Sequence, residues 1–171
     1  MLKRVSDDYI INVLQNHEEL MKAVRQQLAN IFASKDENGL IVCASLYKEN
    51  SGGSRTNEVH DLSDVLDRYN KLCHEWTMSV QSNVRSLIEM QETINRIMAC
   101  YNNLPFDCRY ILEQLYIDNQ YKEGLAKLIK ENQRSRATIL RLRKTAIDTM
   151  KKLYNSKLTN LELYNKYDEY R

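Results

Sequence analysis

Apolar residues recur at alternating steps of three and four from about Val5 to Phe32, which predicts an amphipathic helix. The positions that share its apolar face are Ile10, Leu14, His17, Met21, Val24, Leu28 and Ile31. Residues 40–47 are apolar and suit either a short strand or an apolar segment docked on the helices. The run Ser51-Gly52-Gly53-Ser54 predicts a flexible loop near residues 48–56.

The longest predicted helix carries a heptad repeat that continues without interruption from Val59 to Tyr101. Of its thirteen seam positions only Asn83 is strongly polar, which is typical of a coiled coil. We therefore predict that residues 1–101 form a helical hairpin or coiled coil. The first helix is too short to cover the whole seam. A second copy of the chain is the simplest partner for the uncovered part, which predicts a homodimer through residues 59–101. An ordinary three-helix core is the alternative.

The sequence predicts three shorter helices within residues 102–156. In the first, Pro105 suits the opening turn, and the apolar face consists of Cys108, Ile111, Leu112, Leu115 and Tyr116. The second spans residues 121–132, and its inward positions are predicted to be Leu125, Ala126, Leu128 and Ile129. The third spans about 135–152, begins at Ser135 as N-cap, and has the apolar stripe Ile139, Leu142, Ala146, Met150 and Leu153.

The last segment, residues 157–171, is predicted to be an accessory helix that packs back on the body. Its apolar positions are Leu158, Leu161, Tyr164 and Tyr167. The whole chain of 171 residues has only 4 Gly and 1 Pro, too few for the turns of an all-β fold. Composition and periodicity together predict an all-α protein.

The charge is distributed unevenly along the chain. Although the net charge is only +2, residues 121–152 contain ten Lys and Arg against three acidic residues, and residues 1–120 sum to −5. A basic segment in an otherwise acidic chain fits a localised phosphate-binding surface. In the third helix, Arg136, Ala137, Arg141, Lys144 and Lys151 are predicted to lie opposite the apolar stripe.

The sequence lacks the patterns of several other protein classes. The four cysteines have no Cys-x-x-Cys spacing, and the three histidines complete no ligand set, so we expect neither zinc nor another cofactor. The chain has no phosphate-binding loop, dinucleotide fingerprint or hydrolase motif, and we expect no enzyme activity. The first residues contain no export signal and the longest apolar run is short, which predicts a cytoplasmic protein that contacts no membrane.

A known family shares the pattern of the C-terminal half. Leu104-Pro105, Arg109, Ile111-Leu112, Tyr116-Ile117, Leu125-Ala126 and Ser135-x-x-Thr138-Ile139-x-Arg141-Leu142-x-Lys144-x-Ala146 together resemble region four of bacterial sigma factors. The layout of acidic helices, Gly/Ser loop, long helix and this module resembles small phage transcriptional regulators of the RinA and ArpU type. Two features depart from the family: Ala126 lies nine positions before Ser135 instead of six, and the usual turn glycine is missing.

The resemblance implies a helix-turn-helix module that binds double-stranded DNA, with a recognition helix at about 135–152 in the major groove. The chain would be a sequence-specific transcriptional regulator of a phage or mobile element that works with RNA polymerase rather than starting transcription alone. A small DNA-recognition subunit of a phage DNA-packaging machine is an alternative. A third hypothesis is a helical scaffold whose basic face binds an acidic protein.

Seven residues are candidates for DNA contact. Arginine can bridge guanine O6 and N7, so Arg136 and Arg141 are predicted to read base edges. The other candidates for the groove and its flanking phosphates are Lys130, Gln133, Arg134, Thr138 and Lys144. Thr138 could instead help to cap the helix. Leu140 is predicted to be exposed and to contact either a thymine methyl group or the first helix of the module.

Overall fold

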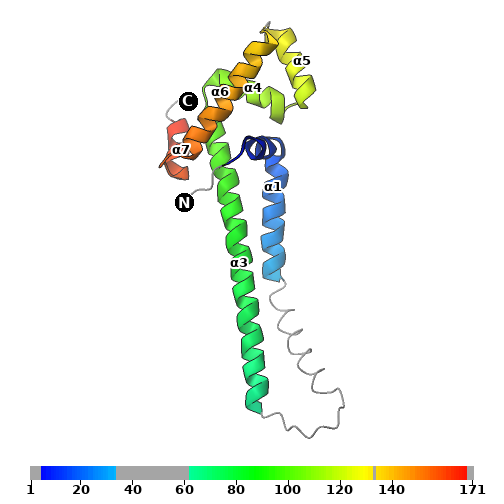
Figure 1. The fold of residues 1–171 in the computed structure, drawn as a ribbon, viewed down its shortest axis with the longest axis vertical. Helices are drawn as coiled ribbons and strands as arrows, with labels where there is room; N and C mark the ends of the chain where they lie inside the picture. The colour runs from blue at the N-terminus through cyan, green and yellow to red at the C-terminus, as the bar shows by residue number, and fades with distance from the viewer. Residues whose placement is uncertain (1–4, 34–61, 133, 169–171) are drawn as a thin grey trace. The chain divides into compact units, whose positions relative to one another are not determined.

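The computed structural model describes the backbone of residues 5–33, 62–132 and 134–168, and these residues contain helices but no strand (Figure 1). The elements are α1 (Asp7–Ala33), α3 (Leu62–Asn102), α4 (Phe106–Leu112), the π-helical turn η1 (Glu113–Ile117), α5 (Tyr121–Asn132), α6 (Arg136–Tyr154) and α7 (Asn160–Asp168). The predicted all-α class is confirmed for this part of the chain. Residues 40–47, the loop near 48–56 and Gln133 lie outside the described residues. No helix in the described ranges is long and apolar enough to cross a membrane.

The chain divides into two compact units. One contains Met1–Met21 with Gln91–Arg171, and we call it the α6 unit; the other contains Lys22–Met90, and we call it the two-helix unit. Both α1 and α3 therefore contribute to both units. The sequence-based boundary at residue 101 differs from this division, because the last turns of α3 belong with α6. Within α1, Asn16 has non-helical dihedrals (φ −125°, ψ 23°), which kink the helix inside its α6-unit part.

The α6 unit holds most of the buried apolar residues of the described chain. The first part of α1 contributes Ile10, Val13 and Leu14, and the end of α3 contributes Ile94, Ile97 and Cys100. The predicted face of the helix after Pro105 is confirmed, because Cys108, Ile111, Leu112, Leu115 and Tyr116 are all buried. Pro105 itself is the N-cap residue of α4 rather than part of its first turn. The unit therefore has a core of its own.

The inward face of α5 differs from the prediction. Leu128 is buried and Leu125 half-buried, but Ala126 and Ile129 are exposed, so the prediction was wrong at these two positions. Gly124 is buried instead, and a Cβ atom there would lie 2.0 Å from the Gln114 carbonyl oxygen. The backbone of α5 thus packs directly against η1, and only glycine leaves room for that approach.

Arg96 joins the end of α3 to the end of α6. Arg96 is 5% exposed, and its guanidinium donates hydrogen bonds to the backbone oxygens of Tyr154 (2.9 Å), Ser156 (3.0 Å) and Leu158 (2.8 Å). A fourth hydrogen bond reaches the Asn160 side-chain oxygen (3.0 Å), and the guanidinium lies 5.5 Å from the centre of the Tyr154 ring. A buried cation therefore satisfies the last carbonyl group of α6, at Tyr154, and two carbonyl groups of the segment that follows the helix.

The accessory helix α7 packs on the unit through a different residue from those predicted. Leu163 is fully buried, whereas Leu161 is 69% exposed and Tyr164 is also exposed. The Asn103 side-chain amide donates a hydrogen bond to the Leu163 carbonyl oxygen (2.6 Å). Thr159 and Glu162 form a reciprocal capping box at the start of α7, which lowers the pKa of the Glu162 carboxyl group.

The two-helix unit has little core. Where its side chains are described, in residues 22–33 and 66–90, only Val24 and Leu87 are buried. The predicted heptad seam is buried at Leu87, Ile94, Ile97 and Tyr101, half-buried at Tyr69, Cys73, Trp76 and Val80, and exposed at Leu66, Asn83 and Met90. Burial of the seam thus falls from the end of α3 toward its start.

Candidate nucleic-acid interface

The N-terminus of α6 is capped as the sequence predicts. Ser135 has extended dihedrals (φ −65°, ψ 149°), and its hydroxyl oxygen accepts a hydrogen bond from the Thr138 backbone N–H (3.2 Å). The hydroxyl groups of Ser135 and Thr138 also lie 2.9 Å apart. Thr138 therefore takes part in the cap, which is one of the two roles expected for it. The cap fixes where α6 begins and thus the rotation of every later side chain about its axis.

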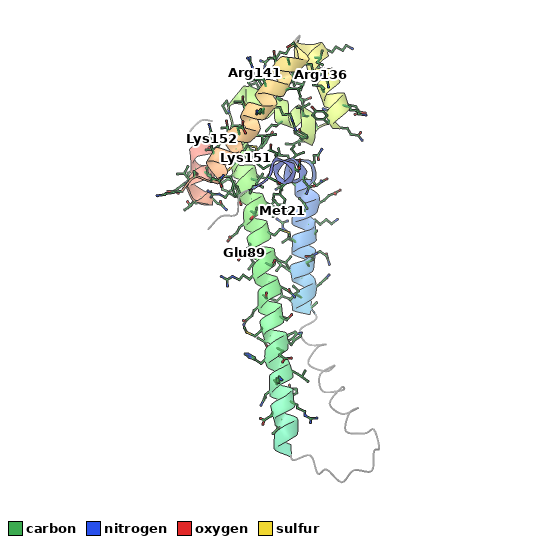
Figure 2. All side chains as sticks on the ribbon, viewed as in Figure 1. Met21, Glu89, Arg136, Arg141, Lys151 and Lys152 are labelled. Carbon is green, nitrogen blue, oxygen red and sulfur yellow. The ribbon has the colours of Figure 1, made fainter. Side chains whose placement is uncertain are left out.

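The apolar side of α6 faces the core. Its buried residues are Ile139, Ala146, Ile147, Met150 and Tyr154, of which Ile147 and Tyr154 were not predicted, while Leu142 and Leu153 are half-buried. Leu140, expected to be exposed, is half-buried. The predicted cationic residues Arg136, Arg141 and Lys144 are all exposed, and Figure 2 labels the two arginines on α6.

Arg141 and Lys144 lie on one face of α6, because residues three apart are neighbours on a helix surface. Asp148, four residues farther along, is exposed on the same face. Arg136 precedes Arg141 by five residues, which places it about 140° around the axis, in the first helical turn. Arg136 and Arg141 therefore do not share one face of α6, but both lie in its first two turns.

Two further cations lie at the end of α5 and in the segment that follows it. Lys130 is exposed near the end of α5, and Arg134 is half-buried. The Arg134 guanidinium donates a hydrogen bond to the Asp107 carboxylate at the start of α4 (3.1 Å). Because both side chains of this pair are substantially exposed, the ion pair orients Arg134 without removing it from solvent.

Arg143 has a different role from the other cations of α6. Its guanidinium lies 5.7 Å from the centre of the Tyr116 ring and 5.8 Å from that of Tyr121, and its Nε donates a hydrogen bond to the Tyr116 hydroxyl. The two rings are stacked with their centres 5.9 Å apart. Burial raises the pKa of Tyr116, and the hydrogen bond from Arg143 opposes that rise. Arg143 thus connects α6 to η1 and α5.

Lys151 differs from Arg141 and Lys144 in having an acidic partner. Its ammonium group forms an ion pair with the Asp7 carboxylate at the start of α1, and both residues belong to the α6 unit. Lys151 follows Lys144 by seven residues and so lies on the same side of α6, but its ammonium group is paired with an acidic residue. Lys152, the next residue, is exposed.

The electrostatics around the start of α6 favour an anion. From Asn132 to Ile147 the chain contains Arg134, Arg136, Arg141, Arg143 and Lys144 and no acidic residue. Glu131 and Asp148 bound this stretch. The N-terminal end of α6 carries the positive end of the helix dipole, which adds to the attraction of negative groups. This arrangement suits the binding of several phosphates close to one helix end.

The two buried thiols, Cys100 and Cys108, are unreactive in their surroundings. Burial raises the pKa of Cys100 to about 11 and also raises that of Cys108. Both thiols therefore remain protonated at neutral pH. Among the residues that the structure describes, no group of three or more histidine, cysteine or acidic side chains is placed to hold a metal ion.

Sequence reasoning missed Arg143, Arg96 and Gly124. Arg143 lies four residues after Ile139 and three before Ala146, which places a cation on the apolar side of the helix. That position was the signal available in the sequence. Arg96 falls between seam positions and gave no signal. Comparison with family models, with curated proteins and with solved structures gave no match to this chain.

Proposed function

We propose that the α6 unit binds double-stranded DNA with sequence preference, and that the protein is a transcriptional regulator of the phage or mobile-element type. In this proposal α5 and α6 act as a helix-turn-helix, and the first turns of α6 enter the major groove. The observation that carries the proposal is the acid-free stretch from Asn132 to Ile147, which presents Arg136, Arg141 and Lys144 to solvent from a capped helix end.

The exposed cations divide into two roles. Arg136 and Arg141 can each present a planar pair of donors to guanine, whereas an ammonium group acts on a phosphate as a point charge. Lys130 and Lys144 would therefore bind the backbone on either side of the groove, and Arg134, which Asp107 orients, would bind a phosphate beside the start of α6. Thr138 stays with the helix cap. Asp148 would repel a phosphate, so it marks the end of the DNA-contacting part of α6.

The double variant Arg136→Ala/Arg141→Ala tests the proposal directly. A duplex is first selected from a random pool by the unmodified chain, and its affinity is compared with that of a scrambled duplex. We expect the ratio of the two affinities to fall by about ten- to a hundredfold in the variant, because α6 then presents no bidentate donors to the base edges in the groove. Fluorescence anisotropy titration at constant salt measures both affinities.

The matched control is Arg25→Ala/Arg68→Ala, which removes the same charge from exposed positions of the two-helix unit. This control should keep the discrimination of the unmodified chain. Full discrimination by Arg136→Ala/Arg141→Ala, or a selection that enriches no duplex, would contradict the proposal. Circular dichroism of each variant checks that helix content is unchanged.

Lys144→Ala tests the phosphate role. We expect binding to every duplex to weaken by about three- to tenfold, with no change in discrimination. The slope of log K against log salt, expected at about −4 to −5 for five phosphates, should become shallower by about 0.9. Titrations at several salt concentrations measure the slope, and Lys22→Ala, at an exposed position of α1, is the control. An unchanged slope would remove Lys144 from the interface.

A further inference from the structure

Two apolar side chains lie among the cations of α6. Ala137 is exposed in the first helical turn, and Leu140, three residues later, is half-buried. The exposed cations Arg141 and Lys144 follow Ala137 by four and seven residues. At about 100° per residue, these four residues fall within roughly 100° of the helix circumference. The solvent-facing side of α6 is therefore interrupted by a small apolar spot, which we define as Ala137 and Leu140.

Ala137 has no role in the core of the α6 unit. Ala146, which is fully buried, follows it by nine residues, so the two alanines lie about 180° apart around the axis of α6. Helices α4 and α5 pack against α6 and leave Ala137 exposed. The methyl group of Ala137 is thus available to a ligand that reaches the solvent-facing side of α6.

The chemistry of the major groove offers one partner for such a spot. Its base edges carry hydrogen-bond donors and acceptors, with one apolar group besides, the C5-methyl group of thymine. A donor or acceptor that faced Ala137 would lose its hydrogen bond to water and gain none from the protein. A methyl group loses no hydrogen bond there and gains from removal of apolar surface from water. Alanine is also short enough to let a base edge approach the helix closely.

We propose that Ala137, with Leu140 beside it, contacts the C5-methyl group of a thymine, so that the preferred DNA site contains a thymine close to the guanine read by Arg141. This inference rests on the proposed function and adds a specificity-determining residue to it. Four residues of helix rise by about 6 Å, and base pairs are about 3.4 Å apart. The thymine therefore lies within about two base pairs of that guanine.

The test removes the methyl group from each partner in turn. In a duplex selected by the full chain, each thymine is replaced singly by uracil, which lacks only the C5-methyl group. We expect one replacement to weaken binding by about three- to fourfold, the effect of one buried methyl group. It should lie within two base pairs of the guanine whose preference Arg141→Ala abolishes. Ala137→Gly should bind the thymine and uracil duplexes equally at that position, as measured by fluorescence anisotropy.

The control variant is Ala29→Gly, which removes the same methyl group from an exposed position of α1 and should keep the thymine preference. Each ratio compares two duplexes with one protein, so a change in helix stability does not produce it. A selected duplex that tolerates every uracil would overturn this inference and leave the proposed DNA binding intact. A thymine preference that survives in Ala137→Gly would also overturn it. A selection that enriches no duplex would contradict the proposed function itself.

Discussion

Arg96→Leu should lower the free energy of unfolding of the α6 unit by about 4 kcal/mol. The guanidinium of Arg96 donates to the carbonyl oxygens of Tyr154, Ser156 and Leu158 and to the Asn160 side chain. Leucine fills a similar volume but leaves these acceptors without a partner in a site that water reaches poorly. It also removes the positive charge from the C-terminal end of the α6 dipole.

Hydrogen exchange measures this loss in the α6 unit itself, since the amides of α6 and α7 report its opening separately from that of the rest of the chain. Arg96→Lys should show roughly half the loss, about 2 kcal/mol, because an ammonium group keeps the charge but cannot span the four oxygens. Arg85→Leu is the control. Arg85 forms an ion pair with Glu89 (3.5 Å) in which both side chains are exposed to solvent. Removing this pair should lower the free energy of unfolding by about 0.5 kcal/mol or less.

An equal effect of Arg96→Leu and Arg85→Leu would show that the Arg96 hydrogen bonds add nothing to stability. A loss confined to α7, with α6 protection unchanged, would show that Arg96 holds only the connection to α7. The expected outcome is loss of protection in both helices, because the three carbonyl oxygens span the end of α6 and the segment that follows it.

Helix positions and the orientation of α6 follow from local patterns in the sequence. The apolar spacing from Ile139 onward and the Ser135 cap are properties of a few neighbouring residues, and the structure has both. The same spacing places Arg141 and Lys144 on the side away from the core. Their exposure therefore needed no knowledge of the rest of the fold.

The orientation of α5 does not follow from its own pattern. Alanine and isoleucine at positions 126 and 129 suggest an apolar face, yet both are exposed. What turns the helix is the close approach of Gly124 to η1, and η1 is a π-helical turn that shifts the side chains following it. A pattern within twelve residues cannot report a contact with the backbone of another element.

Two arginines of α6 and α3 were missed for a related reason. Hydrophobic periodicity assigns charged residues to the surface, whereas Arg96 and Arg143 lie against tyrosine rings and donate to buried or half-buried oxygens. Arginine can do this because its stem and planar head pack on apolar and aromatic surface while its donors are satisfied. The partners lie 58 and 27 residues away in the chain, which no local window includes.

Gly124→Ala should destabilise the α6 unit by about 3 kcal/mol, although alanine is the better helix former. The new Cβ atom would lie 2.0 Å from the Gln114 carbonyl oxygen and 3.2 Å from the Leu115 Cα atom. Both neighbours are backbone atoms, so no change of side-chain rotamer can relieve the clash. Helix α5 must move away from η1, and Leu128, which is buried beside this contact, would lose packing.

The sign of the effect distinguishes this contact from an ordinary helix glycine. At an unconstrained helix position glycine to alanine stabilises by about 1 kcal/mol, and the reverse change Ala126→Gly, at an exposed position of α5, should cost about that amount. Urea unfolding followed by circular dichroism, with hydrogen exchange in α5, compares the two variants. Stabilisation by Gly124→Ala would mean that α5 and η1 do not approach each other closely, and would contradict this account of how α5 is oriented.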